Sequence, residues 1–494
     1  MAASSVLEWS FLVRSRVGFV GRLVGTPMTN IHYLSATELL DAYSRKSLSP
    51  VEVTQATLDR IERVDGKINA FCLVDRDAAM RDARASEQRW MRGAPIGLAD
   101  GLTVTIKDVV LTKGWPTRKG SRTVSADGPW IEDSPPTARL REHGAVILGK
   151  TTTPEFGWKA VGDSPATGIT RNPWSPEYTS GGSSAGAAAG LAAGMGSLAV
   201  GSDGGGSIRI PASFCGVAGI KPTLGRVPYY PPSAMGILGH CGPMARSVED
   251  VALLLTILSG ADPRDPYSLP PLTGDFRDGI HSGIDGLRIA FSPTLGYATV
   301  DSEVHALVVQ AAHELEALGA KVEEVDPGFA SPREAFDVLW KSGAANVLAG
   351  MQLAQLAQLD PGLVVSAQQG AQFSAVDYVK ADFIRTALGK CMAEFHQRFD
   401  LLLTPTVSRP ALPVGVNLVD PAVERDWIDW APFSYPFNMT RQPAATVPCG
   451  MTKLGLPVGM QIVGPLYSEA LVLRTAKAFE ETQSRRVWPD LTND

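Results

Sequence analysis

Residues 201–211 read Gly-Ser-Asp-Gly-Gly-Gly-Ser-Ile-Arg-Ile-Pro, a glycine-rich stretch in which Ser207 follows three glycines. Glycine accepts positive φ and lets a substrate approach the main chain, so successive N–H groups can converge on one developing oxyanion. A tight turn and a phosphate cradle have the same composition. This stretch alone therefore leaves three roles open, and one of them is a serine nucleophile beside its oxyanion donors.

Two upstream segments favour the nucleophile. A second Gly-Ser cluster reads Ser180-Gly-Gly-Ser-Ser-Ala-Gly186, and a lysine ends the run Thr103-Val-Thr-Ile-Lys107. The alternating, β-branched residues 102–106 predict a strand that enters a core. Burial there would lower the pKa of Lys107 towards neutrality, so that its free amine could act as a base. The alternative is a lysine that snorkels from the strand end or pairs with Asp108.

Together these segments resemble the amidase signature family, serine hydrolases that cleave carboxamides with a Ser, cis-Ser and Lys triad. The similarity is dense from about residue 101 to 265 and returns over 436–465. Its core consists of Gly181-Gly-Ser-Ser184, Gly205-Gly-Ser-Ile-Arg-Ile-Pro-Ala-Ser-Phe-Cys-Gly216 and Gly219-Ile-Lys-Pro-Thr223. Such a match over three separated segments is highly specific.

The resemblance implies a role for each residue of the triad. Ser207 would be the nucleophile, Lys107 the base, and Ser183 the serine that bridges them. Gly182 would precede Ser183 through a cis peptide bond. A serine hydroxyl is a weak nucleophile until a neighbour takes its proton, and a neutral lysine can do so through an intervening hydroxyl.

The resemblance also implies supporting residues around Ser207. The oxyanion donors would be the backbone N–H groups of Gly204, Gly205, Gly206 and Ser207. Asp203 and Arg209 would brace the loop, and Ser184 would orient Lys107 or Ser183, although ordinary turn hydrogen bonding is an alternative for these three. The family usually has Thr where this chain has Gly204, a difference that either loosens the loop or widens the site.

Local signals predict alternating helices and strands. Two capping boxes, Ser35-Ala-Thr-Glu38 and Ser49-Pro-Val-Glu52, predict helices over 36–46 and 50–64, the second stopping near Gly66. Further helices are expected from Thr153-Pro-Glu155 onward and over 184–195, 302–318 and 468–483. Strands are expected at 102–106, 146–148, 198–200, 287–291, 321–325 and 401–403. With the resemblance, this order predicts an α/β protein: a single large α/β/α domain with a mixed, largely parallel central sheet.

The 494 residues divide into an N-terminal extension and one amidase domain. Residues 1–27 are basic and acid-poor, typical of a transit peptide, of an amphipathic surface helix, or of a leader before a natural start at Met28; we expect a dispensable extension. Within 28–494 we expect N-terminal helices (28–75), the catalytic signature core (76–270), a variable substrate-pocket region (271–440) and a return to the core (441–494). We expect the stretch from about 330 to 435 to form much of the acyl or leaving-group pocket, although its aromatic cluster is also typical of plain core. The cluster consists of Trp340, Phe373, Trp427, Trp430 and Phe433.

Composition excludes several function classes. A net charge of −6 without a basic run disfavours nucleic-acid binding, and the extension is too interrupted to span a membrane. Five well-separated cysteines predict reduced thiols in a cytoplasmic protein, and seven scattered histidines lack metal-ligand spacing, so we expect no metal and no cofactor. Many relatives self-associate, which leaves a homodimer open.

These features predict an amidase that uses water to cleave the C–N bond of small, fairly apolar carboxamides through an acyl-enzyme. Aryl amides are among the candidate substrates, and carbamate (urethane) or ester cleavage is a candidate side activity. The alternative is the amidase subunit of a glutamyl-tRNA amidotransferase complex, which shares the signature. The run Pro228-Tyr-Tyr-Pro-Pro-Ser233 resembles free-standing amidases instead.

Overall fold

The computed structural model describes residues 30–483 and 487–491, so the expected extension at 1–27 lies outside the described residues. The helices are α1 (Ala36–Ser44), α2 (Pro50–Ile68), α3 (Arg76–Met91), α4 (Pro135–Glu142), α5 (Ala185–Ala192), α6 (Arg209–Cys215), α7 (Val248–Leu258), α8 (Ser302–Ala317), α9 (Arg333–Leu348), α10 (Leu353–Leu356), α11 (Pro361–Gly370), α12 (Ala375–Phe395), α13 (Tyr435–Met439) and α14 (Glu469–Thr482), with 3-10 turns η1 (Ile31–Tyr33), η2 (Glu155–Gly157) and η3 (Gly236–Leu238). The strands are β1 (Phe71–Val74), β2 (Thr103–Lys107), β3 (Val146–Thr151), β4 (Asp163–Ser164), β5 (Gly168–Ile169), β6 (Arg171–Asn172), β7 (Ser175–Thr179), β8 (Leu198–Asp203), β9 (Ala218–Lys221), β10 (His240–Ala245), β11 (Arg288–Phe291), β12 (Lys321–Glu324), β13 (Leu401–Pro405), β14 (Ala444–Met451) and β15 (Pro457–Val463).

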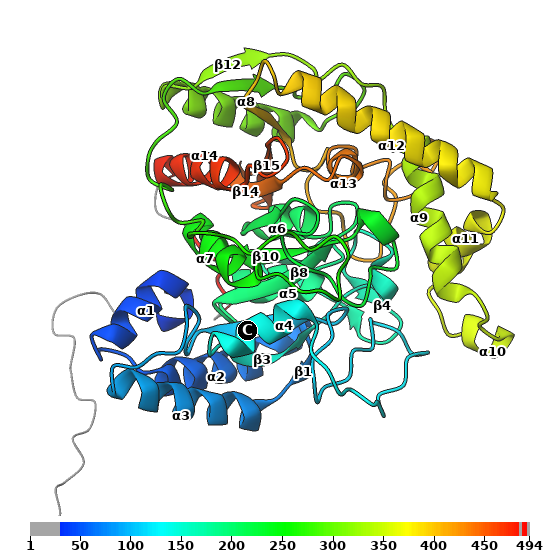
Figure 1. The fold of residues 1–494 in the computed structure, drawn as a ribbon. Helices are drawn as coiled ribbons and strands as arrows, with labels where there is room; N and C mark the ends of the chain where they lie inside the picture. Colours follow the sequence, from blue (N-terminus) through cyan, green and yellow to red (C-terminus); the bar gives the residue numbers. More distant parts are fainter. Residues whose placement is uncertain (1–29, 484–486, 492–494) are drawn as a thin grey trace, which may run out of the picture.

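One mixed sheet runs through the described part of the molecule (Figure 1). Its 11 strands follow the order β1-β3-β2-β8-β10-β9-β14-β15-β13-β11-β12. Parallel ladders join β3, β2 and β8 on one side and β13, β11 and β12 on the other. The strands between these two groups pair antiparallel, as does β1 at the edge. Strands from both ends of the chain thus share one sheet.

Helices cover both faces of the sheet. In β8, Leu198 and Val200 are buried in the core that contains α7, while Ala199 packs with the residues of α5 on the opposite face. This alternation follows from the two-residue period of a strand. In Figure 1, α1, α2 and α3 lie at one end of the molecule, α8 and α12 at the other, and α9 to α11 form one flank. The prediction of a single α/β domain with a mixed sheet and helices on both faces is confirmed.

Two local predictions need correction. Helix α2 passes Gly66 and ends at Ile68, because Asn69 adopts the left-handed conformation (φ 58°) that terminates it. The helix expected after Thr153 is a single 3-10 turn, in which Phe156 takes φ 51°. The Glu155 carboxylate accepts the N–H of Asp360 at 2.6 Å, so a tertiary contact uses the side chain that a helix start would need.

None of the helices in the described ranges combines the length and the apolar character that a membrane crossing requires.

Candidate active site

Strand pairing brings Lys107 to the glycine-rich loop. β2 and β8 are parallel neighbours with Ile106 opposite Val200, so their carboxyl ends meet at the same edge of the sheet. Lys107 ends β2, and its Nζ donates to the Ser202 hydroxyl at 2.9 Å near the end of β8. The same Nζ lies 2.8 Å from Ser183 Oγ. The lysine is therefore held between the two Gly-Ser segments that the sequence singled out.

Burial sets the protonation state of this lysine. Lys107 is fully buried, and the resulting desolvation lowers its pKa from the ordinary value near 10.5 to about 7, although Asp203 acts in the opposite direction. The prediction of a desolvated strand lysine is confirmed. Near neutral pH its amine therefore exists in both protonated and free forms, as a general base requires.

The backbone before Ser183 accepts only a small residue. The Gly182–Ser183 peptide bond is cis, and a Cβ on Gly182 would lie 2.6 Å from the carbonyl oxygen of Val161. The next residue joins the two serine segments, since the Ser184 N–H donates to the carbonyl oxygen of Ser207 at 3.0 Å. This contact fixes Ser183 and Ser207 relative to each other through the main chain.

The Ser184 side chain contacts Ser202 rather than Lys107 or Ser183, the two residues that it was expected to orient. Its hydroxyl donates to the Ser202 carbonyl at 3.1 Å and accepts the Ser202 N–H at 3.3 Å. Its side chain thus fixes Ser202, and Ser202 in turn holds Lys107. Tyr229 also contacts Ser202 through its hydroxyl. Sequence analysis missed Ser202 and Tyr229, although the alternation along β8 could have placed the Ser202 side chain on a different face from Asp203.

A buried ion pair braces the loop that carries Ser207. Arg209 donates through Nε and Nη2 to the two carboxylate oxygens of Asp203, both at 2.9 Å. Burial by itself raises the pKa of Asp203, but Arg209 and the Asn438 amide outweigh it and hold the pKa well below the ordinary range. The remaining guanidinium N–H groups reach Asn438 and Gln461. The bracing geometry expected of Asp203 and Arg209 is present.

The four expected oxyanion donors are not equivalent. The Gly206 N–H donates to Asp203 Oδ1 at 2.7 Å, so this donor already has an acceptor, contrary to its expected role. Among the described residues, no hydrogen bond engages the N–H groups of Gly204, Gly205 and Ser207. The Gly205 carbonyl accepts the Ser434 hydroxyl at 2.6 Å. The backbone N–H groups of Gly204, Gly205 and Ser207, on either side of Gly206, thus have no acceptor in the described part of the chain.

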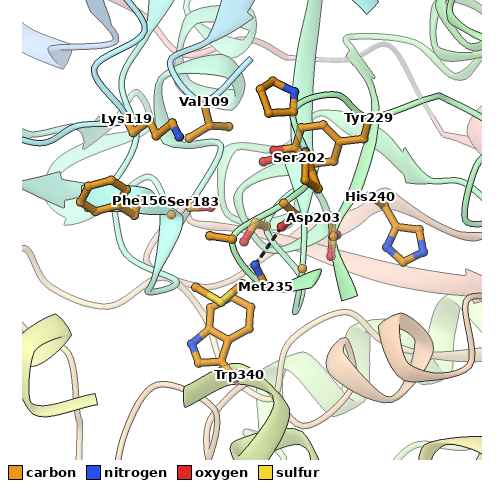
Figure 2. Close-up of a pocket in the computed structure, with 18 of the residues that line it drawn as sticks. Val109, Lys119, Phe156, Ser183, Ser202, Asp203, Tyr229, Met235, His240 and Trp340 are labelled. Carbon is orange, nitrogen blue, oxygen red and sulfur yellow. Dashed lines mark hydrogen bonds between the residues drawn. The ribbon is translucent and has the colours of Figure 1, made fainter. Parts of the chain in front are cut away.

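A small cavity of about 80 Å³ lies beside this loop (Figure 2). Ser183, Ser202, Asp203, Gly204 and Ser207 all line it, and Lys107 lies behind Ser183. In Figure 2, Trp340 lies on one side beneath Met235, while Lys119, Val109 and Phe156 lie on the opposite side. The cavity therefore has an aromatic side and a side that contains a lysine.

Of the expected pocket aromatics, Trp340 lines the cavity directly. It stacks on Phe336 with ring centroids 5.5 Å apart and meets Trp427 edge-on at 5.3 Å. Trp430 and Phe433 are fully buried in the core, which is the alternative left open for this aromatic cluster. Phe373 lies in the segment between α11 and α12.

Gly204 and Trp340 share one space. A Cβ on Gly204 would lie 3.0 Å from Cζ3 of Trp340, closer than nearly all real contacts of this kind. The glycine thus makes room for the indole, and the space that a threonine side chain would fill belongs to Trp340.

No group of three or more His, Cys, Asp or Glu side chains in the described ranges is arranged to hold a metal ion.

The chain matches the family model described as Amidase over residues 52–473. The chain belongs to the amidase signature family. Members of this family act on amides, and the chain is an amide-hydrolysing enzyme.

Two kinds of related protein align with most of this chain, acylamidases and amidotransferase subunits. An acylamidase from Rhodococcus erythropolis is 36% identical over 474 residues, with 93% of this chain and 97% of the relative covered. A glutamyl-tRNA(Gln) amidotransferase subunit from Moorella thermoacetica is 35% identical over 490 residues, covering 93% and 99%. Sequence identity alone therefore does not distinguish an acylamidase from an amidotransferase subunit.

Solved structures of the family have the same fold. A bacterial aryl acylamidase superposes with a TM-score of 0.85 at 32% identity, covering 91% of this chain and 96% of that chain. A 6-aminohexanoate cyclic dimer hydrolase complexed with its substrate superposes with a TM-score of 0.83 at 29% identity, covering 94% and 100%. The amidase signature fold expected from the sequence is confirmed.

Proposed function

We propose that this amidase signature enzyme is an acylamidase that hydrolyses small, fairly apolar carboxamides, aryl amides included, through an acyl-enzyme. The observation that carries the proposal is the buried Lys107 amine, 2.8 Å from Ser183 Oγ, at the edge of the cavity that Ser207 lines. The similarity to an acylamidase and to an aryl acylamidase supports this choice of substrate.

In this mechanism Ser207 Oγ attacks the amide carbonyl carbon. Its proton passes to Ser183 Oγ, while the Ser183 proton passes to the free amine of Lys107. The new C–O bond breaks the carbonyl π bond, and the resulting oxyanion accepts hydrogen bonds from the N–H groups of Gly204, Gly205 and Ser207. We assign Gly206 to the Asp203 brace, because its N–H is already donated there.

Collapse of the tetrahedral intermediate reverses the proton path. Ser183 delivers its proton to the leaving nitrogen and regains one from the Lys107 ammonium, so the amine departs neutral and the acyl group stays on Ser207. Water then attacks the ester carbonyl, again losing a proton through Ser183 to Lys107. When the new tetrahedral intermediate collapses, its C–O bond to Ser207 breaks and the same proton returns through Ser183 to Ser207 Oγ, which releases the carboxylic acid and restores the Ser207 hydroxyl and the free Lys107 amine. Carbamates and esters present a similar carbonyl to the same groups, so we propose their cleavage as a side activity.

The alternative of an amidotransferase subunit has support in the relatives of that name. We favour the free-standing enzyme because an aryl acylamidase structure and an acylamidase sequence are at least as similar. The test is hydrolysis of an anilide, a primary amide, a carbamate and an ester by the purified full chain without ATP or a partner, with Ser207→Ala as control. Activity that requires both ATP and a partner protein would contradict the proposal.

A further inference from the structure

Lys119 brings an amine without an ion-pair or hydrogen-bond partner among the described residues to the candidate catalytic cavity. It belongs to the segment between β2 and α4, is partly buried, and lines the cavity with Ser183 and Ser207. Figure 2 shows its side chain extending towards Val109 on the side of Ser183. Within the described ranges, no hydrogen bond or ion pair engages its Nζ, and burial lowers its pKa. A cation in this position lacks both full hydration and a counter-ion.

The carboxylate that acts on Lys119 is already occupied. Asp108 raises the pKa of Lys119 through its charge, but its Oδ1 accepts the Arg118 N–H and its Oδ2 the Gly120 N–H, both at 3.2 Å. The Lys150 amine also lies near this carboxylate, 4.0 Å from Asp108 Oδ1. The Asp108 side chain therefore has partners of its own and leaves the Lys119 amine without a direct contact.

The other ionisable groups of the cavity add no negative charge to balance Lys119. Asp203 is neutralised by Arg209. Burial holds the pKa of His240 well below its ordinary value, so its ring is neutral at neutral pH. Lys107 contributes either no charge or a second positive one. Any net charge that these groups of the cavity carry therefore comes from its lysines and is positive.

The backbone holds Lys119 in place at the cavity. Lys119 has φ 55° and Phe156 has φ 51°, both in the left-handed region that ordinary side chains avoid. The Phe156 N–H donates to the Lys119 carbonyl at 2.7 Å, and both side chains line the cavity. Non-glycine residues keep such conformations where the surrounding structure enforces them, often at ligand sites. Lys119 is therefore presented to the cavity by a fixed backbone.

We propose that Lys119 binds a carboxylate on the substrate, so that the enzyme prefers amides that carry an acidic group on one side of the scissile bond. The proposal rests on the proposed function and specifies its substrate class. A bound carboxylate would form a charge-assisted hydrogen bond and supply the missing counter-ion. Since Trp340 lies across the cavity from Lys119, the apolar part of the same substrate would pack against the indole.

Matched pairs of anilides test the proposal. Succinanilic acid against butyranilide places the acid on the acyl side, and 4-acetamidobenzoate against 4-methylacetanilide places it on the amine side. We expect the wild type to prefer the acid in one pair. Lys119→Met should lower kcat/KM for that acid about 10- to 100-fold relative to its neutral partner, mainly through KM. Lys119→Arg should retain most of the preference, because it keeps the charge.

Lys113→Met is the matched control, since Lys113 is exposed in the same segment and does not line the cavity. It should leave the preference unchanged. The proposal is overturned if the wild type prefers neither acid, or if Lys119→Met slows the acid and its neutral partner by the same factor.

Binding separates this proposal from the proposed function. If the wild type hydrolyses none of the four anilides, the proposed function fails, and calorimetry on Ser207→Ala protein then decides the role of Lys119. Succinanilic acid or 4-acetamidobenzoate should bind about 10-fold or more weakly when Lys119→Met is added. If, for each acid, the dissociation constant is the same with and without Lys119→Met, the proposal is overturned independently of catalysis.

Discussion

The Lys107 amine lies 2.8 Å from the Ser183 hydroxyl, and neither side chain has appreciable contact with solvent. A buried amine can take the proton of a neighbouring hydroxyl only when the amine itself is deprotonated. In the proposed mechanism, the protonation state of Lys107 therefore determines when the enzyme can work.

The first prediction concerns the pH profile. The proposed mechanism requires the free amine of Lys107, whose pKa is lowered to about 7. The value of kcat/KM should therefore rise as pH passes upward through about 7 and then level off. The measurement is kcat/KM for a neutral anilide from pH 5 to 10. An inflection near the ordinary lysine value of about 10.4 would contradict a desolvated base.

Removing the proposed nucleophile, Ser207, should abolish turnover without unfolding the protein. Ser207→Ala should lower kcat by at least about 1,000-fold, because no other group can form the acyl-enzyme. Circular dichroism and the thermal midpoint should match the wild type, since no hydrogen bond of the Ser207 hydroxyl supports the fold in the described residues. Full hydrolysis by this variant would rule out the proposed mechanism.

The pair Asp203 and Arg209 should contribute to stability as well as to catalysis. Arg209→Met leaves the buried Asp203 carboxylate without its bidentate partner and should cost about 3–5 kcal/mol in the free energy of unfolding. Urea denaturation measures the loss. The double variant Asp203→Asn with Arg209→Met should lose less than the sum of the two single changes; simple additivity would mean that the ion pair is not coupled.

Gly204 and Trp340 should show strong coupling. Gly204→Thr places a side chain against the indole and should lower activity, because either the loop or Trp340 must move. Trp340→Ala vacates that space and should restore part of the activity in the double variant. A double-mutant cycle on kcat/KM measures the coupling, and a Gly204→Thr protein with wild-type activity would show that the contact does not matter.

Trp340 should also limit substrate size. On its far side lies a second cavity of about 670 Å³, lined by Trp158 and Trp427 among others, and Trp340 lines both cavities. Trp340→Ala should therefore improve hydrolysis of amides with bulky acyl or amine groups relative to small ones. A series of acyl chain lengths measures the change, and an unaltered length preference would show that another residue sets the limit.

The sequence predicted those features that depend on local chemistry. The capping boxes at Ser35 and Ser49 define where α1 and α2 begin, because the side chain and backbone involved lie three residues apart. The burial of Lys107 was predictable because an alternating, β-branched run places it at the end of a central strand.

Features that depend on distant residues escaped prediction. The turn at Glu155 looked like a helix start, but its carboxylate binds the N–H of Asp360 about 200 residues later in the chain. Likewise, nothing near Gly204 in the sequence shows that Trp340 fills the space beside it. The role of Ser202 also depends on the pairing of β2 with β8, which a single sequence does not specify.

The contacts of Arg209 have a consequence for the synthesis of the enzyme. Its guanidinium binds Asn438 in α13 and Gln461 in β15, so the loop that carries Ser207 is braced by residues near the end of the chain. A chain still emerging from the ribosome can contain Lys107, Ser183 and Ser207 and yet lack these partners. Hydrolytic activity should therefore begin only after the segment that contains Asn438 and Gln461 has been synthesised and has folded against this loop.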